Sequence, residues 1–115
     1  MASVGGQTQR IARAMTWLER HFNQPLNITQ LAEQVGMSAS QFHRSFKAVT
    51  AMSPLQYQKT LRLSEAQRLM LTRKIDAARA AFEVGYVSPS QFSREYRRQY
   101  GVSPSSHVAA LRQSA

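Results

Sequence analysis

Two short segments of this chain carry the same polar side chains at the same spacing. Residues 40–47 read SQFHRSFK and residues 90–97 read SQFSREYR, so the pattern Ser-Gln-Phe-x-Arg-x-(Phe/Tyr)-(Lys/Arg) recurs at an offset of fifty residues. Arg presents a planar fork of N–H donors that matches phosphate oxygens and the O6 and N7 edge of guanine, while Ser and Gln bond to bases or phosphates. The repeated segment therefore predicts recognition of a nucleic acid.

Catalytic chemistry has little support in the same residues. The three histidines, at positions 21, 43 and 107, show no metal-ligand spacing, and the chain contains no Cys. There is no nucleophile elbow, P-loop or dinucleotide fingerprint. Asp76 is the only Asp and has no carboxylate partner at catalytic spacing. We expect no enzyme activity, no metal and no cofactor.

Composition points to a polyanionic partner. The chain has 115 residues, the size of one domain, and a formal net charge of +9. Twelve of its fifteen basic residues are Arg. No apolar run approaches the ~20 residues of a membrane span. We therefore expect a cytoplasmic protein without a membrane partner, associated with the nucleoid through DNA.

The residues that end and start helices around each repeat predict two helix-turn-helix modules. Gly36 follows a helical stretch at residues 29–35, and Ser38 with Gln41 forms a capping-box pattern for the next helix. In the second copy Ser88 is the N-cap, Pro89 the first helical residue, and Gln91 completes the pattern. No window alternates apolar and polar residues as a strand would, so the predicted fold class is all-α.

The segments around the repeats complete the predicted organisation. Residues 1–9 contain a Gly pair and are expected to be a flexible linker or a remnant of cloning. Residues 10–53 form the first helix-turn-helix subdomain, and its first helix has a predicted apolar stripe of Ile11, Met15, Leu18 and Phe22. Residues 54–72 form a linker helix of roughly 28 Å, and residues 73–112 form the second subdomain. Such a helix could hold two recognition helices in successive major-groove segments.

Three motifs resemble the DNA-binding domain of the AraC/XylS family of bacterial transcriptional regulators. They are Val84-Gly85-Tyr86, Ser90-x-Phe92-x-Arg94-x-Tyr96-Arg97 and Gly101-Val102-Ser103-Pro104, and the likeness covers residues 10–112. The resemblance implies seven helices, two helix-turn-helix subdomains joined by a long central helix, and a third and sixth helix that enter the major groove. It also implies regulation of transcription, often activation through contact with RNA polymerase. The sequence departs from the family pattern at three positions. Ala51 stands where the first repeat usually has Gly, and Ala77 and Ala80 stand where the second usually has larger aliphatic residues.

The resemblance also bears on the partners of the whole protein. Many family members carry a separate effector-binding or dimerisation domain, and we expect this chain to be a domain excised from such a protein. We expect the isolated domain to be a monomer, because both predicted recognition helices lie on one chain.

Candidate DNA contacts are the side chains that the buried aromatic residues leave outside. Phe42 and Phe46 are expected to face inward in the first repeat, which leaves Ala39, Ser40, His43, Arg44 and Lys47. By their place in the motif, Ser40, His43 and Arg44 resemble the family's base-reading residues, with Lys47 near the backbone. The alternative is a solvated face, or an Arg44 that is held in an intramolecular ion pair.

In the second repeat Phe92 and Tyr96 are expected to face inward. The remaining candidates are Pro89, Ser90, Gln91, Ser93, Arg94 and Arg97. Ser90, Ser93 and Arg94 are favoured as base or phosphate contacts, and Arg97 and Arg98 as phosphate clamps. Gln91 stays open between two roles, since a side chain engaged in a capping box cannot read adenine with the same donors. Trp17 is expected in the core rather than stacked on a base.

The leading functional hypothesis is sequence-specific binding of double-stranded DNA by a transcription regulator. The alternative is a protein-interaction module that docks polymerase or an effector domain without reading DNA. A third hypothesis is nonspecific architectural binding. Two similarly capped helices that each expose Ser and Arg favour specific DNA binding over both.

Overall fold

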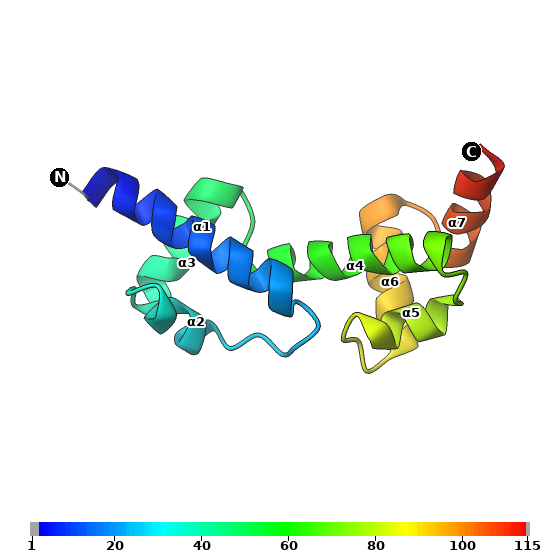
Figure 1. Cartoon of the computed structure of the whole chain (residues 1–115), viewed down its shortest axis with the longest axis horizontal. Helices are drawn as coiled ribbons and strands as arrows, with labels where there is room; N and C mark the ends of the chain where they lie inside the picture. The colour runs from blue at the N-terminus through cyan, green and yellow to red at the C-terminus, as the bar shows by residue number, and fades with distance from the viewer. Residues whose placement is uncertain (1–2, 115) are drawn as a thin grey trace. The chain divides into compact units, whose positions relative to one another are not determined.

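Seven α-helices make up the part of the chain that the computed structural model describes, which is the backbone of residues 3–114 and the side chains of residues 6–114 (Figure 1). No strand occurs in residues 3–114, so the predicted all-α fold class is confirmed. None of these helices is long and apolar enough to cross a membrane. The helices are α1 (Ser3–His21), α2 (Ile28–Gln34), α3 (Ala39–Thr50), α4 (Pro54–Thr72), α5 (Ala77–Glu83), α6 (Pro89–Tyr100) and α7 (Pro104–Gln113).

The chain folds into two compact units that are divided between Lys59 and Thr60, inside α4. The first unit contains α1, α2, α3 and the start of α4, and the second contains the rest of α4 with α5, α6 and α7. Residues 54–72 were predicted to form a linker helix between the two subdomains. In the structure each half of this helix belongs to the core of one unit.

The core of the first unit lies where α1 packs on α3. Phe42 and Phe46 of α3 are fully buried, and the Phe46 ring meets the Tyr57 ring edge-on at 5.5 Å. From α1 the buried residues are Ile11, Ala14 and Leu18. Met15 and Phe22, which were predicted in the apolar stripe, are only half-buried. The stripe is therefore rotated toward Ala14, because a small residue lets α1 approach α3 closely.

The predicted linker at residues 1–9 is helical from Ser3 onward, and residues 1 and 2 lie outside the described residues. Two glycines in a helix each cost about 1 kcal/mol relative to Ala, which is why the sequence pattern favoured a linker. A tertiary contact opposes that cost. The Gln7 side chain donates a hydrogen bond to the hydroxyl of Ser45, a buried residue of α3.

The core of the second unit repeats this arrangement. Phe92 and Tyr96 of α6 are fully buried, in the same places as Phe42 and Phe46. The predicted apolar face of α4 packs here, with Leu63, Ala66, Leu69 and Met70 all buried. Ala80 has no exposed surface, so α5 lies close to its neighbours where a larger aliphatic residue was expected.

Side-chain caps start the six helices α2 to α7, and the cap of α4 is Ser53. Asn27, Ser38, Asp76, Ser88 and Ser103 each accept a hydrogen bond from the backbone N–H three residues later. The Ser half of the two predicted capping boxes is therefore confirmed, at 3.2 Å for both Ser38 and Ser88. The returning bonds from Gln41 and Gln91 are not formed. A complete reciprocal box occurs instead at the start of α4, between Ser53 and Gln56.

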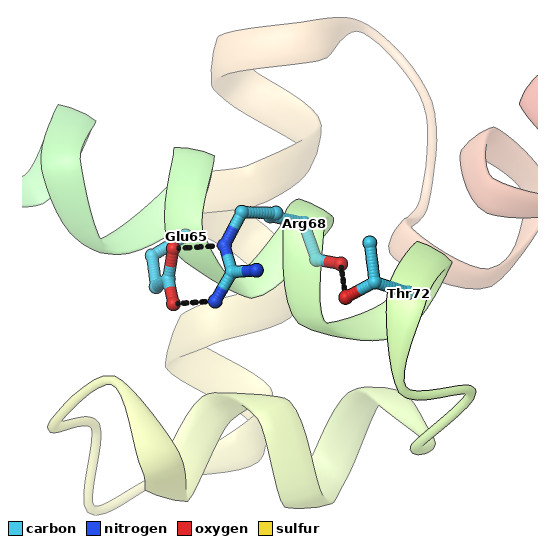
Figure 2. Close-up of polar contacts among 3 residues, drawn as sticks. All are labelled: Glu65, Arg68 and Thr72. Carbon is cyan, nitrogen blue, oxygen red and sulfur yellow. Dashed lines mark hydrogen bonds and ion pairs between the residues drawn. The ribbon is translucent and has the colours of Figure 1, made fainter.

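The exposed side of α4 in the second unit carries an ordered ion pair (Figure 2). The Arg68 guanidinium forks onto the Glu65 carboxylate, with Nε to Oε1 at 2.8 Å and Nη2 to Oε2 at 2.7 Å. The Thr72 hydroxyl donates to the Arg68 carbonyl at 2.7 Å. These contacts lie within one helix and support its last two turns.

Candidate DNA-binding interface

Each unit contains a helix-turn-helix built on the same backbone turn. Gly36 follows α2 with φ +76° and Gly85 follows α5 with φ +106°, a region that L side chains rarely adopt. The next residue then bonds back to the first helix: the Met37 N–H donates to the Ala32 carbonyl, and the Tyr86 N–H to the Ala81 carbonyl, both at 2.9 Å. The predicted pair of helix-turn-helix modules is confirmed.

The turn of the second repeat is one residue longer than that of the first, because two residues separate Gly85 from Ser88 and one separates Gly36 from Ser38. Met37 and Tyr86 make the same backbone bond and are both buried, so they are equivalent. Val87 is therefore the inserted residue. It has 88% of its surface exposed, directly before the N-cap of α6. The insertion bulges outward and leaves the packing of the turn unchanged.

The predicted contacts of the first repeat lie on the solvent side of α3. Ser40, His43, Arg44 and Lys47 are exposed and Ala39 is half-buried, while Phe42 and Phe46 fix the rotation of the helix from inside. The Arg44 guanidinium donates to the Ser40 hydroxyl at 3.0 Å. Among the described side chains of residues 6–114, Arg44 has no acidic partner, so the structure does not support the ion-pair alternative. The structure places Arg44 and Ser40 side by side.

The predicted contacts of the second repeat lie on α6 in the same way. Pro89, Ser90, Ser93, Arg94 and Arg97 are exposed, and Gln91 is half-buried. Arg94 stands two residues after the buried Phe92, as Arg44 does after Phe42. The structure thus groups the predicted residues on one outer face of each helix. Their contact with DNA remains a prediction.

The Gln91 side chain bonds to a residue that neither of its two predicted roles named. Its backbone N–H donates to Ser88, but its side-chain Nε2 donates to Oε2 of Glu95 at 3.0 Å. Oε1 of the same carboxylate accepts from the Tyr86 hydroxyl at 2.6 Å. Burial and the bond to Glu95 raise the pKa of the Tyr86 phenol above its ordinary value. The phenol therefore stays protonated and donates.

Arg62 of α4 completes this group of contacts. Its guanidinium carbon lies 5.4 Å from the centre of the Tyr86 ring, an arrangement that the ring's negative face stabilises. Burial lowers the pKa of Arg62, and the attraction of Glu95 opposes that effect. Sequence reasoning missed Arg62 and Glu95. The four-residue spacing of Gln91 and Glu95 on one helix was the available signal.

The charge on the two exposed helix faces is strongly positive. Helix α3 contains no acidic residue, and Glu95 is the only one in α6. Its carboxylate is engaged on the protein side by Tyr86 and Gln91. The faces that carry Arg44 and Arg94 are therefore suited to a polyanion, as the +9 net charge predicts.

Arg10 of α1 is exposed, and its Nη1 lies 3.4 Å from the Gly36 carbonyl at the turn of the first helix-turn-helix. Trp17 was expected in the core. It is half-buried and stacks on His21 with ring centroids 4.4 Å apart. In the described part of the chain no three His, Asp or Glu residues gather as a metal site would need.

Comparisons with known proteins agree with this geometry. A family model described as "Helix-turn-helix domain" matches residues 31–109. The HTH-type transcriptional regulator CdhR of Pseudomonas aeruginosa is 30% identical over 107 residues, which are 93% of this chain and 32% of that protein. The HTH-type transcriptional activator RhaS of Escherichia coli (strain SE11) is 32% identical over 102 residues, 89% of this chain and 37% of that protein. The chain thus spans about a third of the length of these curated relatives.

Solved structures show the same fold. The DNA-binding domain of AdpA, in complex with a target DNA, has a TM-score of 0.83 and 33% identity, and the match covers 90% of this chain and 94% of that one. An AraC-type regulator from Chromobacterium violaceum has a TM-score of 0.83 and 27% identity, over 91% and 94% of the two chains. The family match, the doubled helix-turn-helix and these neighbours show that the chain belongs to the AraC/XylS family of transcriptional regulators, as an AraC-type DNA-binding domain.

Proposed function

We propose that this domain binds double-stranded DNA sequence-specifically, with α3 and α6 in successive major-groove segments of one duplex. The observation that carries the proposal is the equivalence of the two outer faces. In each repeat a buried Phe fixes the helix rotation, and an exposed Arg follows two residues later, at Arg44 and Arg94. A structural neighbour with the same fold is bound to its target DNA.

The exposed residues divide into two roles under this proposal. Arg44 and Arg94 are long enough to place a guanidinium on the O6 and N7 atoms of a guanine, and Ser40, His43, Ser90 and Ser93 contact nearby bases or phosphates. Lys47, Arg97 and Arg98 lie further along the helices and clamp phosphates, which sets affinity but not sequence. Ala39 and Pro89 supply apolar contacts at the start of each helix.

The wider role of the protein is part of the same proposal. It acts in the bacterial cytoplasm at the nucleoid, as a regulator of transcription that contacts RNA polymerase. Its DNA-binding domain works together with an effector-binding or dimerisation domain elsewhere in the whole protein. The relatives, which are about three times as long as the matched region, support this view.

A protein-interaction module is the second candidate, because some large apolar side chains are exposed. Phe82 of α5 is 56% exposed and Val87 is 88% exposed. Neither residue lies on the outer faces of α3 or α6. Phe82 and Val87 are therefore compatible with a protein contact in addition to DNA binding. They give no reason to replace DNA binding by a protein contact.

The test begins with in vitro selection of the DNA sequences that the domain binds. Arg44→Ala and Arg94→Ala should each lower affinity for the selected site by ~1–3 kcal/mol, and each should relax the base preference in only one half of the site. Arg79→Ala is the matched control, since Arg79 is an exposed Arg of α5 that pairs with Glu83. Melting temperatures of all variants separate a contact from a folding defect.

Selection that recovers no preferred sequence would refute specific binding. Unchanged base preference in Arg44→Ala or Arg94→Ala would remove that residue from the set of base contacts. An equal loss of affinity for selected and scrambled duplexes would assign the residue to phosphate contact.

A further inference from the structure

We propose that Glu95 is a positioning residue that orients the Gln91 amide to read adenine in the second half of the DNA site. The inference rests on the proposed function, because it assumes that α6 enters the major groove. It adds a residue to the recognition apparatus that does not itself touch DNA. The inference also gives Gln91 a defined chemical role, which the sequence left open between capping and base contact.

The direction of the amide follows from the chemistry of its partner. An ionised carboxylate only accepts hydrogen bonds, so the Gln91 side chain must turn its NH₂ group toward Glu95, as the 3.0 Å contact shows. The carbonyl oxygen Oε1 and the second N–H of Gln91 then stay available for a base, on the side of the amide away from Glu95. A Gln amide without such a partner can rotate by half a turn at little cost.

The carboxylate is itself held in place from the protein side. The Tyr86 hydroxyl donates to its Oε1 at 2.6 Å, and Tyr86 is 4% exposed, in the packed turn before α6. The Phe92 ring meets the Tyr86 ring edge-on at 5.4 Å, and Arg62 covers the same tyrosine. Because Tyr86 is anchored in the core, its hydroxyl holds the Glu95 carboxylate beside Gln91, and the carboxylate in turn orients the Gln91 amide.

Adenine is the base that this orientation fits. Its major-groove edge offers the N6 donor beside the N7 acceptor, and one amide presents a matching acceptor and donor side by side. Guanine offers two acceptors, O6 and N7, which require two donors. With one N–H committed to Glu95, Gln91 cannot supply both. The hydrogen bond to Glu95 therefore disfavours guanine at this position. A Gln91 amide without that bond could donate both N–H groups to guanine.

The first repeat provides an internal contrast. Gln41 is the counterpart of Gln91, and its side chain is exposed and has no hydrogen bond to another residue in the described part of the chain. The counterpart of Glu95 is Ser45, which is buried and accepts from Gln7. The counterpart of Tyr86 is Met37, which has no hydroxyl. The network occurs only in the second repeat, so a tight adenine preference is expected only there.

The experiment is a double-mutant cycle on base preference. Selected duplexes that differ only at the base pair most sensitive to Gln91→Ala are titrated with the wild type, Gln91→Ala, Glu95→Ala and the double variant. The wild type should prefer adenine over guanine by about tenfold or more at this position. Both single variants should lose most of that preference. Glu95→Ala should have no further effect in the Gln91→Ala background, because Glu95 acts only through Gln91.

Three further variants isolate the cause. Glu95→Gln preserves the side-chain shape, but its amide can donate as well as accept hydrogen bonds. It should therefore also lose the preference for adenine. This variant replaces Glu95→Ala if that one folds poorly. Tyr86→Phe keeps the ring and removes the hydroxyl, and it should give an intermediate loss. Glu83→Ala removes a negative charge from an exposed position of α5 and should leave the preference unchanged. Melting curves establish that each variant is folded.

The outcomes separate the inference from the proposed function. Retained adenine preference in folded Glu95→Ala and Glu95→Gln would overturn the inference, and so would a Gln91→Ala variant with the wild-type preference. In both cases specific DNA binding would stand. A wild type without any sequence preference would refute the proposed function, and the inference with it.

Discussion

Ala51 is one of two residues other than Gly that adopt a positive φ in the described part of the chain. It ends α3 in the left-handed region with φ 64°, and its N–H donates to the Lys47 carbonyl at 2.8 Å. Gly101 ends α6 in the same way, with φ 82° and an N–H bonded to the Arg97 carbonyl at 2.7 Å. The two repeats thus use the same C-terminal turn, and only the second has the residue type that adopts it without strain.

The first prediction exchanges these two residues. A left-handed conformation costs a residue with a Cβ about 1–2 kcal/mol, and a glycine adds about 0.4–1 kcal/mol of entropy to the unfolded chain. Ala51→Gly should therefore stabilise the domain by about 0.5–1 kcal/mol, as measured by urea unfolding. Gly101→Ala is the matched control and should destabilise by a similar amount. An added Cβ there meets no atom within 4 Å, so the left-handed backbone conformation is the only source of the cost. A loss of stability in Ala51→Gly would show that strain at this turn is negligible.

At the scale of the secondary-structure element, caps and ion pairs within one helix decide local stability. Helix α5 has only seven residues and is started by Asp76, which accepts from the Arg79 N–H at 2.8 Å. In the longer α4, the Glu65–Arg68 fork lies in the last part of the helix (Figure 2). The hydrogen bond from Arg68 holds the pKa of the Glu65 carboxyl below its ordinary value of 4.5.

The second prediction concerns the pH dependence of this fork. A carboxyl whose pKa is lowered in the folded state stabilises the fold above its ordinary pKa, and the effect is lost as pH falls through the lowered value. Glu65→Gln should therefore slightly lower the melting temperature at pH 7. The difference from wild type should narrow below pH 4.5 and disappear in stronger acid. The effect is small because both side chains are partly exposed.

Glu83→Gln provides the comparison for that measurement. Its carboxylate lies 3.8 Å from Nε of Arg79, without the two short bonds of the fork. A smaller change in melting temperature is expected at pH 7. If the Glu65→Gln difference were independent of pH, lost packing rather than lost charge would be its cause.

At the scale of the whole molecule, the excess of basic residues predicts how strongly salt opposes binding. If the exposed Arg and Lys residues neutralise ~6–8 phosphates, the logarithm of the binding constant should fall with the logarithm of salt concentration at a slope near −5 to −7. Arg97→Ala should weaken binding to all sequences alike and reduce the slope by about one. Titration over a range of salt concentrations measures both quantities. A flat response would mean that the net charge of +9 serves solubility.

Both predicted recognition helices belong to one chain, which determines the expected stoichiometry. One copy of the domain should bind an asymmetric site with two contacted segments about one helical turn apart. Analytical ultracentrifugation with and without the selected duplex should show a monomer and a 1:1 complex. An obligate dimer on a palindromic site would contradict this expectation.

Much of the fold follows from patterns that lie within one or two helical turns. The Ser-Gln-Phe repeat, the glycines at 36 and 85 and the serine caps at 38 and 88 each act on their immediate neighbours, so their spacing alone predicts helix starts, turns and buried faces. Phe42 and Phe92 are fully buried as the repeat predicts. The resemblance to AraC/XylS regulators extended these local patterns to the whole domain.

Tertiary structure decided the contacts between residues that are distant in sequence. The helical state of residues 3–9 is supported by Gln7 and Ser45, which are 38 positions apart. The Gln91 side chain bonds to Glu95 of its own helix, and the packed turn before α6 brings the Tyr86 hydroxyl to the same carboxylate. A sequence shows which partners a polar side chain can reach within its own helix. Which of them it bonds depends on the charges and donors that the rest of the fold places beside it.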